Sequence, residues 1–183
     1  FKASLKPPPK GKWTEYPHTN HASIDSLFNR CKELYDEDPT KAPTIIFIKA
    51  GEHEVMGKFG QEDEDEDEDG EMQQVHRPYV LIQYAMQIIG AGRDKTFITN
   101  GGFKILGRRG RRGKRVDMQG MTMKGASQCG LYNDNGLSFL CKDMTFTQYG
   151  EAGVWAENTK GRFINCVITQ CRWSGIYCYK NAS

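Results

Sequence analysis

The amino-acid sequence predicts an all-β fold, a right-handed parallel β-helix solenoid with an N-terminal capping α-helix. Three observations lead to this prediction: one apolar motif recurs three times in the last third of the chain, its period is short, and strand alternation continues through it without a helical stretch. A coil of this length can bury its apolar face only against neighbouring coils, so the copies are expected to stack. With 183 residues, the chain suits one domain with a sizeable core.

Glycines align the three copies of the motif, since Gly130, Gly153 and Gly175 are separated by 23 and then 22 residues. The apolar positions that repeat with them form four columns: Met118, Cys141 and Phe163; Met121, Met144 and Cys166; Met123, Phe146 and Ile168; Leu131, Val154 and Ile176. Because successive side chains of a strand point to opposite faces, these inward columns place Tyr132, Trp155 and Tyr177 in one outward column. An antiparallel sandwich is the competing interpretation, but it needs hairpin signals and tolerates irregular spacing.

The residues before the repeats supply an arm, a cap and a first strand. Residues 1–22, with three consecutive prolines and scattered lysines, predict an extended Pro/Lys-rich arm on the surface. Ser23 suits the N-cap of an amphipathic helix, whose apolar positions recur at helical spacing: Ile24, Leu27, Phe28, Cys31, Leu34 and Tyr35. Pro39 and Pro43 end this helix, and the β-branched run Thr44–Lys49 is typical of a buried strand.

Further β segments and two charged runs precede the repeats. The expected segments are Tyr79–Gln83, which leads into Ile88–Gly92, and Thr96–Thr99, while the basic run separates Phe103–Leu106 from the repeats. The acidic loop 61–72 and the basic loop 107–115 both fall where turns are expected, so we interpret them as loop insertions. Residues 23–183 then form one unit of cap helix and β-helix coils, which we interpret as a fragment of a longer solenoid.

The segments Thr44–Val55, Val80–Gln83 and Ile88–Thr99 look like the opening coils of pectin methylesterases and their non-enzymatic relatives. Together with the repeats, they make the chain resemble the pectin lyase-like superfamily of right-handed parallel β-helix proteins. The resemblance implies an N-terminal helix that covers the open end of the solenoid, a role that the helix after Ser23 can fill.

The resemblance implies no catalytic residue. Pectin methylesterases carry Asp-Phe-x-Phe-Gly and Gly-Arg-Pro-Trp patterns, of which Asp143–Thr147 is a near match, while Arg172-Trp173 lacks the proline and glycine context. Lyases of the superfamily need clustered acidic calcium ligands and a basic arginine, and the outward charged residues make no such pattern here.

The outward aromatic column is the candidate site for a protein or glycan partner. Neighbouring coils lie about 4.8 Å apart, so Tyr132, Trp155 and Tyr177 are expected to form a flat ladder on which a sugar ring or a partner side chain can stack. In the alternative interpretation, the rings stack only on each other or under a loop and stabilise the solenoid.

The basic loop is the candidate site for polyanions, with six cationic side chains: Arg108, Arg109, Arg111, Arg112, Lys114 and Arg115. Such a cluster attracts polyanions independently of their sequence. The alternatives are a nuclear-import signal, neutralisation of the acidic loop of the same molecule, or a solvated loop.

No metal site and no cofactor is expected. Gly90–Arg93 lacks the full phosphate-binding fingerprint, and the acidic run lacks the spacing of a calcium loop. The four histidines are expected at the surface: His18, His21, His53 and His76. The six cysteines show neither a compact disulfide framework nor a CxxC spacing, which favours reduced core thiols. No membrane contact is expected, and an intracellular location, cytoplasmic or nuclear, is favoured without excluding secretion.

These features favour a non-catalytic β-helix scaffold or recognition domain that presents outward ladders and charged loops to a macromolecular partner. Further coils or another chain are expected at the C-terminal end, because natural solenoids cover exposed coil ends. The alternative is a polysaccharide-active enzyme, esterase-like or lyase-like, whose active site is degenerate or outside this piece. Such an enzyme would need outward acidic residues such as Asp134 or Glu157.

Overall fold

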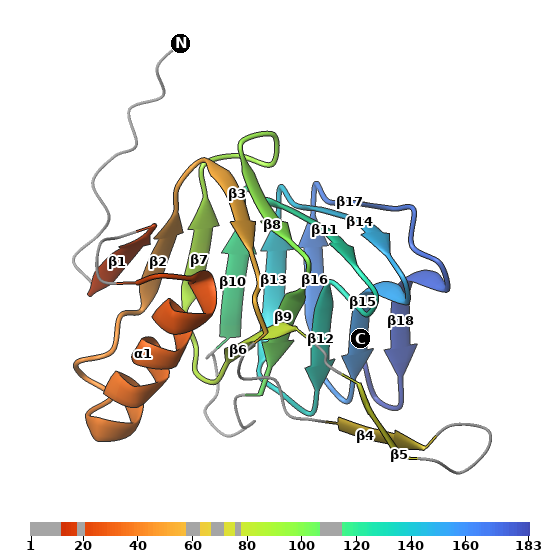
Figure 1. The fold of residues 1–183 in the computed structure, drawn as a ribbon, viewed down its shortest axis with the longest axis horizontal. Coiled ribbons are helices and arrows are strands. Elements are labelled where there is room, and N and C mark those ends of the chain that lie inside the picture. The colour runs from red at the N-terminus through yellow and green to blue at the C-terminus, as the bar shows by residue number, and fades with distance from the viewer. Residues whose placement is uncertain (1–11, 18–20, 58–62, 67–71, 76–77, 107–114) are drawn as a thin grey trace.

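The computed structural model describes residues 12–17, 21–57, 63–66, 72–75, 78–106 and 115–183. These residues wind into successive coils, each of which contributes one strand to each of three parallel sheets (Figure 1). The fold is a right-handed parallel β-helix with one helix near the N-terminus, so the predicted fold class is confirmed.

The strands of each sheet follow one another along the solenoid axis and are all parallel to their neighbours. The first sheet consists of β1 (Trp13–Tyr16), β2 (Ile45–Ile48), β7 (Gln87–Gly90), β10 (Arg115–Gln119), β13 (Ser138–Lys142) and β16 (Gly161–Ile164). The second consists of β3 (Gly51–Glu54), β8 (Thr96–Thr99), β11 (Thr122–Ala126), β14 (Thr145–Tyr149) and β17 (Val167–Thr169). The third consists of β6 (Tyr79–Ile82), β9 (Gly102–Ile105), β12 (Leu131–Asp134), β15 (Ala152–Glu157) and β18 (Ser174–Tyr179). We call β16, β17 and β18 the last coil.

The observed register confirms three of the four predicted inward columns, and Met121 and Met144 of the fourth are buried. The structure pairs Leu131 with Val154 and Val154 with Ile176, and likewise Met123 with Phe146 and Phe146 with Ile168, and Met118 with Cys141 and Cys141 with Phe163. The columns continue into the earlier coils, where Phe103 precedes Leu131 and Ile98 precedes Met123. One continuous apolar core therefore runs along the solenoid.

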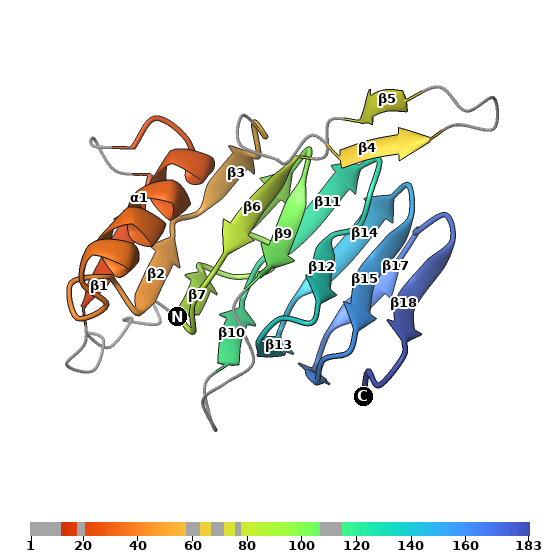
Figure 2. The same cartoon turned by 90° about the horizontal axis from the view of Figure 1, so that it is seen from below.

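Helix α1 (Ile24–Glu37) closes the N-terminal end of the solenoid, beside β2 and β6 (Figure 2). Ser23 is its N-cap in a capping box with Ser26, in which the Ser26 N–H donates to Ser23 Oγ at 3.1 Å and the Ser23 N–H donates to Ser26 Oγ at 3.2 Å. The helix buries Ile24, Leu27, Phe28 and Cys31, and the Phe28 ring lies 5.8 Å from that of Phe103. The predicted cap helix is confirmed. Among the described residues, no helix has the length and apolar character needed to cross a membrane.

The N-terminal arm is part of the solenoid where the structure describes it. Strand β1 pairs in parallel with β2, and the Thr44 N–H donates to the Lys12 carbonyl at 2.9 Å. Tyr16 is buried, which corrects the expectation of a surface arm over 1–22. The composition of the arm predicted an exposed segment. Strand β2, however, has an edge with free backbone groups, and the extended arm pairs with them. Residues 1–11 and 18–20 lie outside the described residues.

His53 also departs from the sequence-based expectation of a surface residue. It occupies an inward position of β3, in register with Ile98, and it is buried. The Tyr16 ring packs against it at 5.3 Å, and its Nε2 lies 2.9 Å from the Lys49 carbonyl oxygen. Strand β1 covers His53, so the burial depends on the pairing that the sequence did not reveal. His18 and His76 lie outside the described residues.

The charged insertions sit between strands of the coils. Between β3 and β6, strands β4 (Asp63–Glu66) and β5 (Met72–Val75) form an antiparallel hairpin outside the three sheets (Figure 2). The acidic insertion is therefore a hairpin in part, not only a loop. Of the basic loop 107–115, only Arg115 lies in the described residues, and it begins β10, where its side chain pairs with Asp117.

Residues in the left-handed conformation lie at the corners between strands, except Gln148, which lies within β14. These residues, other than glycine, are Asn100, Asn135, Asp143, Gln148, Asn158, Asn165, Gln170 and Lys180. Asp143, the near match to the esterase motif, has φ 52° and accepts a 2.5 Å hydrogen bond from Asn165 Nδ2. It stabilises a corner, which explains an aspartate there without a catalytic role.

Candidate functional site

The outward aromatic column forms a ladder on the third sheet. Tyr132, Trp155 and Tyr177 are register partners on β12, β15 and β18. The rings of Tyr132 and Trp155 lie 5.9 Å apart with an interplanar angle of 23°, and those of Trp155 and Tyr177 lie 4.2 Å apart at 35°. The ladder follows from the sequence period, because equivalent positions of neighbouring coils fall side by side.

The ladder is longer than the sequence indicated. Lys104 is the register partner of Tyr132 on β9, and its Nζ lies 5.4 Å from the centre of the Tyr132 ring. At the other end, the Tyr179 ring lies 6.3 Å from the Tyr177 ring. Alternation along β18 already places Tyr179 on the face of Tyr177. The sequence did not reveal that Lys104 belongs to the ladder, because the basic insertion makes the separation between Lys104 and Tyr132 longer than one coil period.

Exposure divides the ladder into a packed part and an open part. Tyr177 is 39% and Tyr179 is 48% exposed, whereas Tyr132 and Trp155 are half-buried. Trp155 Nε1 is buried and has no hydrogen-bond partner in the part of the chain that the structure describes. A buried donor without a partner costs free energy, so this indole N–H does not stabilise the column. The open rings of the last coil are the accessible stacking surface.

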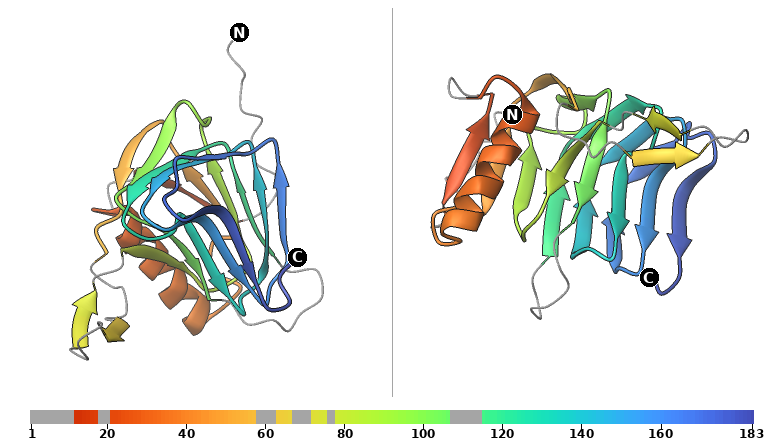
Figure 3. Two further views of the ribbon diagram at one scale, coloured as in Figure 1. Left: turned by 90° about the vertical axis from the view of Figure 1, so that its right-hand side faces the viewer. Right: turned by 60° about the horizontal axis from the view of Figure 1, so that its bottom comes forward.

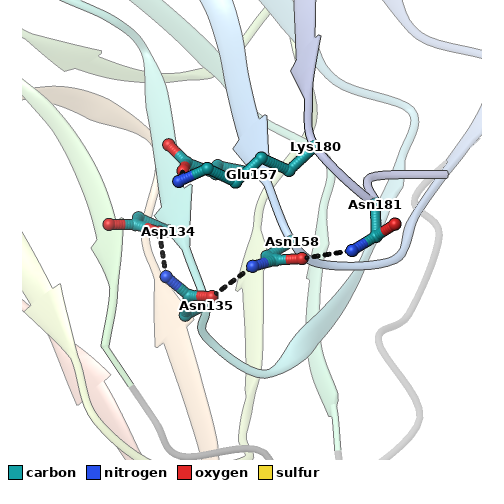
Figure 4. A network of polar contacts seen from close by, with 6 residues as sticks. All are labelled: Asp134, Asn135, Glu157, Asn158, Lys180 and Asn181. Carbon is teal, nitrogen blue, oxygen red and sulfur yellow. Dashed lines mark hydrogen bonds and ion pairs between the residues drawn. The ribbon is translucent and has the colours of Figure 1, made fainter.

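A polar edge borders the ladder where β12, β15 and β18 end (Figure 4). Asn158 Nδ2 donates to Asn135 Oδ1 at 2.8 Å, and Asn181 Nδ2 donates to Asn158 Oδ1 at 3.1 Å. Asn135 Nδ2 in turn donates to Asp134 Oδ1. The result is a chain of hydrogen-bonded amides along the corner that ends on the Asp134 carboxylate.

Two carboxylates of this edge lie on neighbouring strands, since Asp134 and Glu157 are register partners. Glu157 is largely buried and pairs with Lys180, whereas Asp134 is exposed. The hydrogen bond with Glu157 and the charge of Glu157 raise the pKa of Lys180, so the ammonium remains protonated and neutralises this carboxylate. Two adjacent carboxylates are the groups that glycoside hydrolysis uses, but here one of them is committed to an ion pair.

The remaining candidate residues are not assembled into a site by the described structure. Arg108, Arg109, Arg111, Arg112 and Lys114 lie outside the described residues, and polyanion binding there stays a prediction. Within the described ranges, no group of three or more His, Cys, Asp or Glu side chains is placed to hold a metal ion.

The described structure has a cavity away from the ladder. It measures about 480 Å³, is formed by residues of β1, α1 and the following turn, and is lined by Lys12, Trp13, Thr14, His21, Leu27, Arg30, Cys31, Leu34, Lys41 and Pro43. Arg30 and Lys41 already pair with Glu33 and Asp38, which lie on the same helix and turn. Nothing in its geometry selects a ligand.

Three parallel sheets, a helical cap and stacked columns define the class: the chain has the right-handed parallel β-helix fold. No protein-family model matches the sequence, and the search of curated proteins gives no match. Two solved structures of the catalytic domain of a GH87 alpha-1,3-glucanase, both of variants in complex with nigerose, match 97% and 96% of the chain with TM-scores of 0.54 and 0.52. Sequence identity is 14% in both, and the chain covers 33% of each matched chain, or about a third of its length. The likeness shows the fold.

Proposed function

We propose that the outward face of the third sheet binds a polysaccharide, and that the domain acts in recognition without catalysing a reaction itself. The observation that carries the proposal is the continuous column of Tyr132, Trp155 and Tyr177, with rings 5.9 Å and 4.2 Å apart. The column runs along the solenoid axis, so an extended glycan that lies on it meets one ring per coil. The structural neighbours, glycoside hydrolase domains in complex with nigerose, support a carbohydrate ligand.

The charge around the ladder favours an uncharged glycan. Lys104 and Lys180 bring two positive charges, and Asp134 and Glu157 bring two negative charges. Because the charges balance, neither a polyanion nor a polycation gains net attraction at this face. The amide and carboxylate groups of the corner are suited to hydrogen bonds with sugar hydroxyls.

The direct experiment is titration calorimetry with nigerose, longer uncharged glucans and polygalacturonate. Tyr177→Ala is expected to weaken binding of the uncharged glucan by about 1–3 kcal/mol, roughly 5- to 150-fold, because it removes the most accessible ring of the three. Trp155→Ala is expected to act in the same direction. Trp173→Ala is the matched control, since Trp173 is 68% exposed but does not belong to the column. Equal loss in Tyr177→Ala and Trp173→Ala would contradict a site on the ladder.

The second candidate is a polysaccharide-active enzyme, and the adjacent carboxylates Asp134 and Glu157 are the observation that favours it. An enzyme would release reducing ends from one of the same polymers, and Asp134→Asn or Glu157→Gln would abolish the release while leaving the circular dichroism spectrum unchanged. Turnover with these properties would replace the non-catalytic proposal. Binding without turnover supports recognition.

A further inference from the structure

The outward face of the third sheet carries an aromatic and an acidic position side by side. Along β12, Leu131 and Asn133 are 0% exposed in the core, so alternation places Tyr132 and Asp134 together on the outside. Two residues of a strand span about 7 Å, so a sugar ring that lies on Tyr132 has hydroxyls within reach of Asp134. The three sheets face in different directions around the solenoid axis, so this face is separate from the outward faces of the other two (Figure 3).

Of the two adjacent carboxylates on this face, only Asp134 is available to a ligand. Glu157, its register partner, is 9% exposed and pairs with Lys180. Asp134 is exposed and takes part in no ion pair among the residues that the structure describes. Its Oδ1 accepts from Asn135 Nδ2, and within the described ranges its Oδ2 accepts no hydrogen bond. One carboxylate oxygen beside the ladder therefore remains for a hydroxyl donor.

A chain of amides restrains this carboxylate before a ligand arrives (Figure 4). Asn135, which donates to Asp134, accepts from Asn158 Nδ2 at 2.8 Å, and Asn158 accepts from Asn181 Nδ2 at 3.1 Å. A restrained side chain has less rotamer freedom to lose, so ordering it on binding costs less free energy. A polar group held in this way also discriminates against a sugar that lacks the matching hydroxyl.

A positive charge lies beside the same ring. Lys104 is the register partner of Tyr132 on β9, and its Nζ lies 5.4 Å from the ring centre. A ligand on Tyr132 therefore meets a donor at Lys104 and an acceptor at Asp134. Sugar hydroxyls both donate and accept, so an unsubstituted sugar satisfies both groups, whereas a uronic-acid carboxylate next to Asp134 is repelled.

We propose that Asp134 is the specificity-determining residue of the glycan site. Its free carboxylate oxygen accepts a hydrogen bond from one hydroxyl of the sugar on Tyr132, and this bond selects neutral glycans that carry an unsubstituted hydroxyl at that position. The inference rests on the proposed function, because it requires a glycan on the ladder, and it adds the group that selects among glycans. In this role Asp134 binds the ligand and takes no part in bond cleavage.

The test is titration calorimetry of the full chain with nigerose and with the set of monodeoxy nigeroses, each of which lacks one hydroxyl. One of these sugars is expected to bind the parent chain roughly tenfold or more weakly than nigerose, because a hydrogen bond to a charged group is lost. Asp134→Ala is expected to lose roughly tenfold or more in affinity for nigerose and to bind that monodeoxy sugar and nigerose equally. Asp134→Asn retains an oxygen acceptor and is expected to recover most of the affinity.

Glu54→Ala is the matched control. Glu54 is an exposed carboxylate of β3 that also accepts from a corner asparagine, Asn100 Nδ2, at 3.1 Å. It belongs to the second sheet, so this variant is expected to bind both sugars as the parent chain does.

Parental affinity in Asp134→Ala, together with reduced affinity in Tyr177→Ala, would overturn the role of Asp134 and leave the glycan site on the ladder intact. A weaker affinity for the monodeoxy sugar that persists in Asp134→Ala would assign the hydroxyl to another residue and overturn the proposal. Release of glucose from nigerose that Asp134→Asn abolishes would make Asp134 catalytic, with the same consequence. If the parent chain binds neither nigerose nor a longer glucan, the proposed function and this inference fail together.

Discussion

Asparagine at the corners of the solenoid combines two properties that few side chains share. It tolerates the left-handed backbone conformation, with φ 54° at Asn135 and 51° at Asn158. Its amide also donates and accepts, so Asn158 bonds Asn135 on one side and Asn181 on the other. The three asparagines are 23 residues apart, which makes this ladder a sequence signal of the same kind as the glycine spacing.

Cysteine burial leads to a prediction about pH. All six cysteines are free, and Cys31, Cys129 and Cys141 are buried while Cys178 is exposed. Burial raises the pKa of Cys31 from 9.0 to about 11. Because the folded-state pKa lies above the unfolded-state pKa, the contribution of the protonated thiol is complete below pH 9 and is lost as the pH rises toward 11.

Between pH 8 and 10.5, the free energy of unfolding of the parent chain is expected to decrease as the Cys31 thiol titrates. In Cys31→Ala this decrease is expected to be smaller by about 2 kcal/mol. Urea unfolding at several pH values measures this slope. Cys178→Ala is the control, since its thiol is exposed, and it is expected to keep the parent slope. If both variants have the parent slope, Cys31 is not held protonated by burial.

At the scale of elements, the inward side chains of a coil are most deeply buried where the coil has a neighbour on each side. Phe146 of β14 is 0% exposed between Met123 and Ile168, whereas Ile168 of β17 is only partly buried. Phe146→Asp is expected to unfold the repeats, with a cost of several kcal/mol for an unpaired buried charge. Ile168→Asp, in the same column, is expected to cost much less. Circular dichroism melting measures both variants, and similar losses would contradict the dependence of the cost on burial.

The acidic hairpin is expected to contribute little to folding. Strands β4 and β5 pair only with each other and lie outside the three sheets. Replacing Glu62–Asp69 by a Gly-Ser linker should leave the thermal midpoint nearly unchanged, because closing a loop costs little more as its length changes. A drop of more than a few degrees in calorimetry would indicate structural contacts of the acidic segment.

The whole molecule is a stack in which each coil contacts only its neighbours, so local stability is expected to depend on how many neighbouring strands an element has. Strands β10, β11 and β12 lie between neighbouring strands on both sides, whereas β4 and β5 pair only with each other. We expect amide hydrogen exchange to be slowest in β10–β15 and markedly faster in β4 and β5, because local opening of the hairpin breaks the fewest contacts. Equally slow exchange in β4 and β12 would contradict this expectation.

The sequence by itself determined the features that repeat. The inward columns, the outward ladder and the β-helix fold could be predicted from the sequence. Equivalent residues of a solenoid recur at a near-constant offset, and strand alternation assigns their faces. The cap helix could be predicted from local sequence, because apolar residues recur at helical spacing after the N-cap Ser23.

Only the tertiary structure decided the contacts that follow no period. Strand β1 reaches β2 across the whole of α1, and this pairing buries Tyr16 and His53. Lys104 joins the ladder although an insertion separates it from Tyr132, and Lys180 neutralises Glu157 from the next coil. Strand pairing depends on which backbone edges are left open in space, and ion pairs depend on side-chain reach between coils. Neither property is encoded by the order of residue types along one coil.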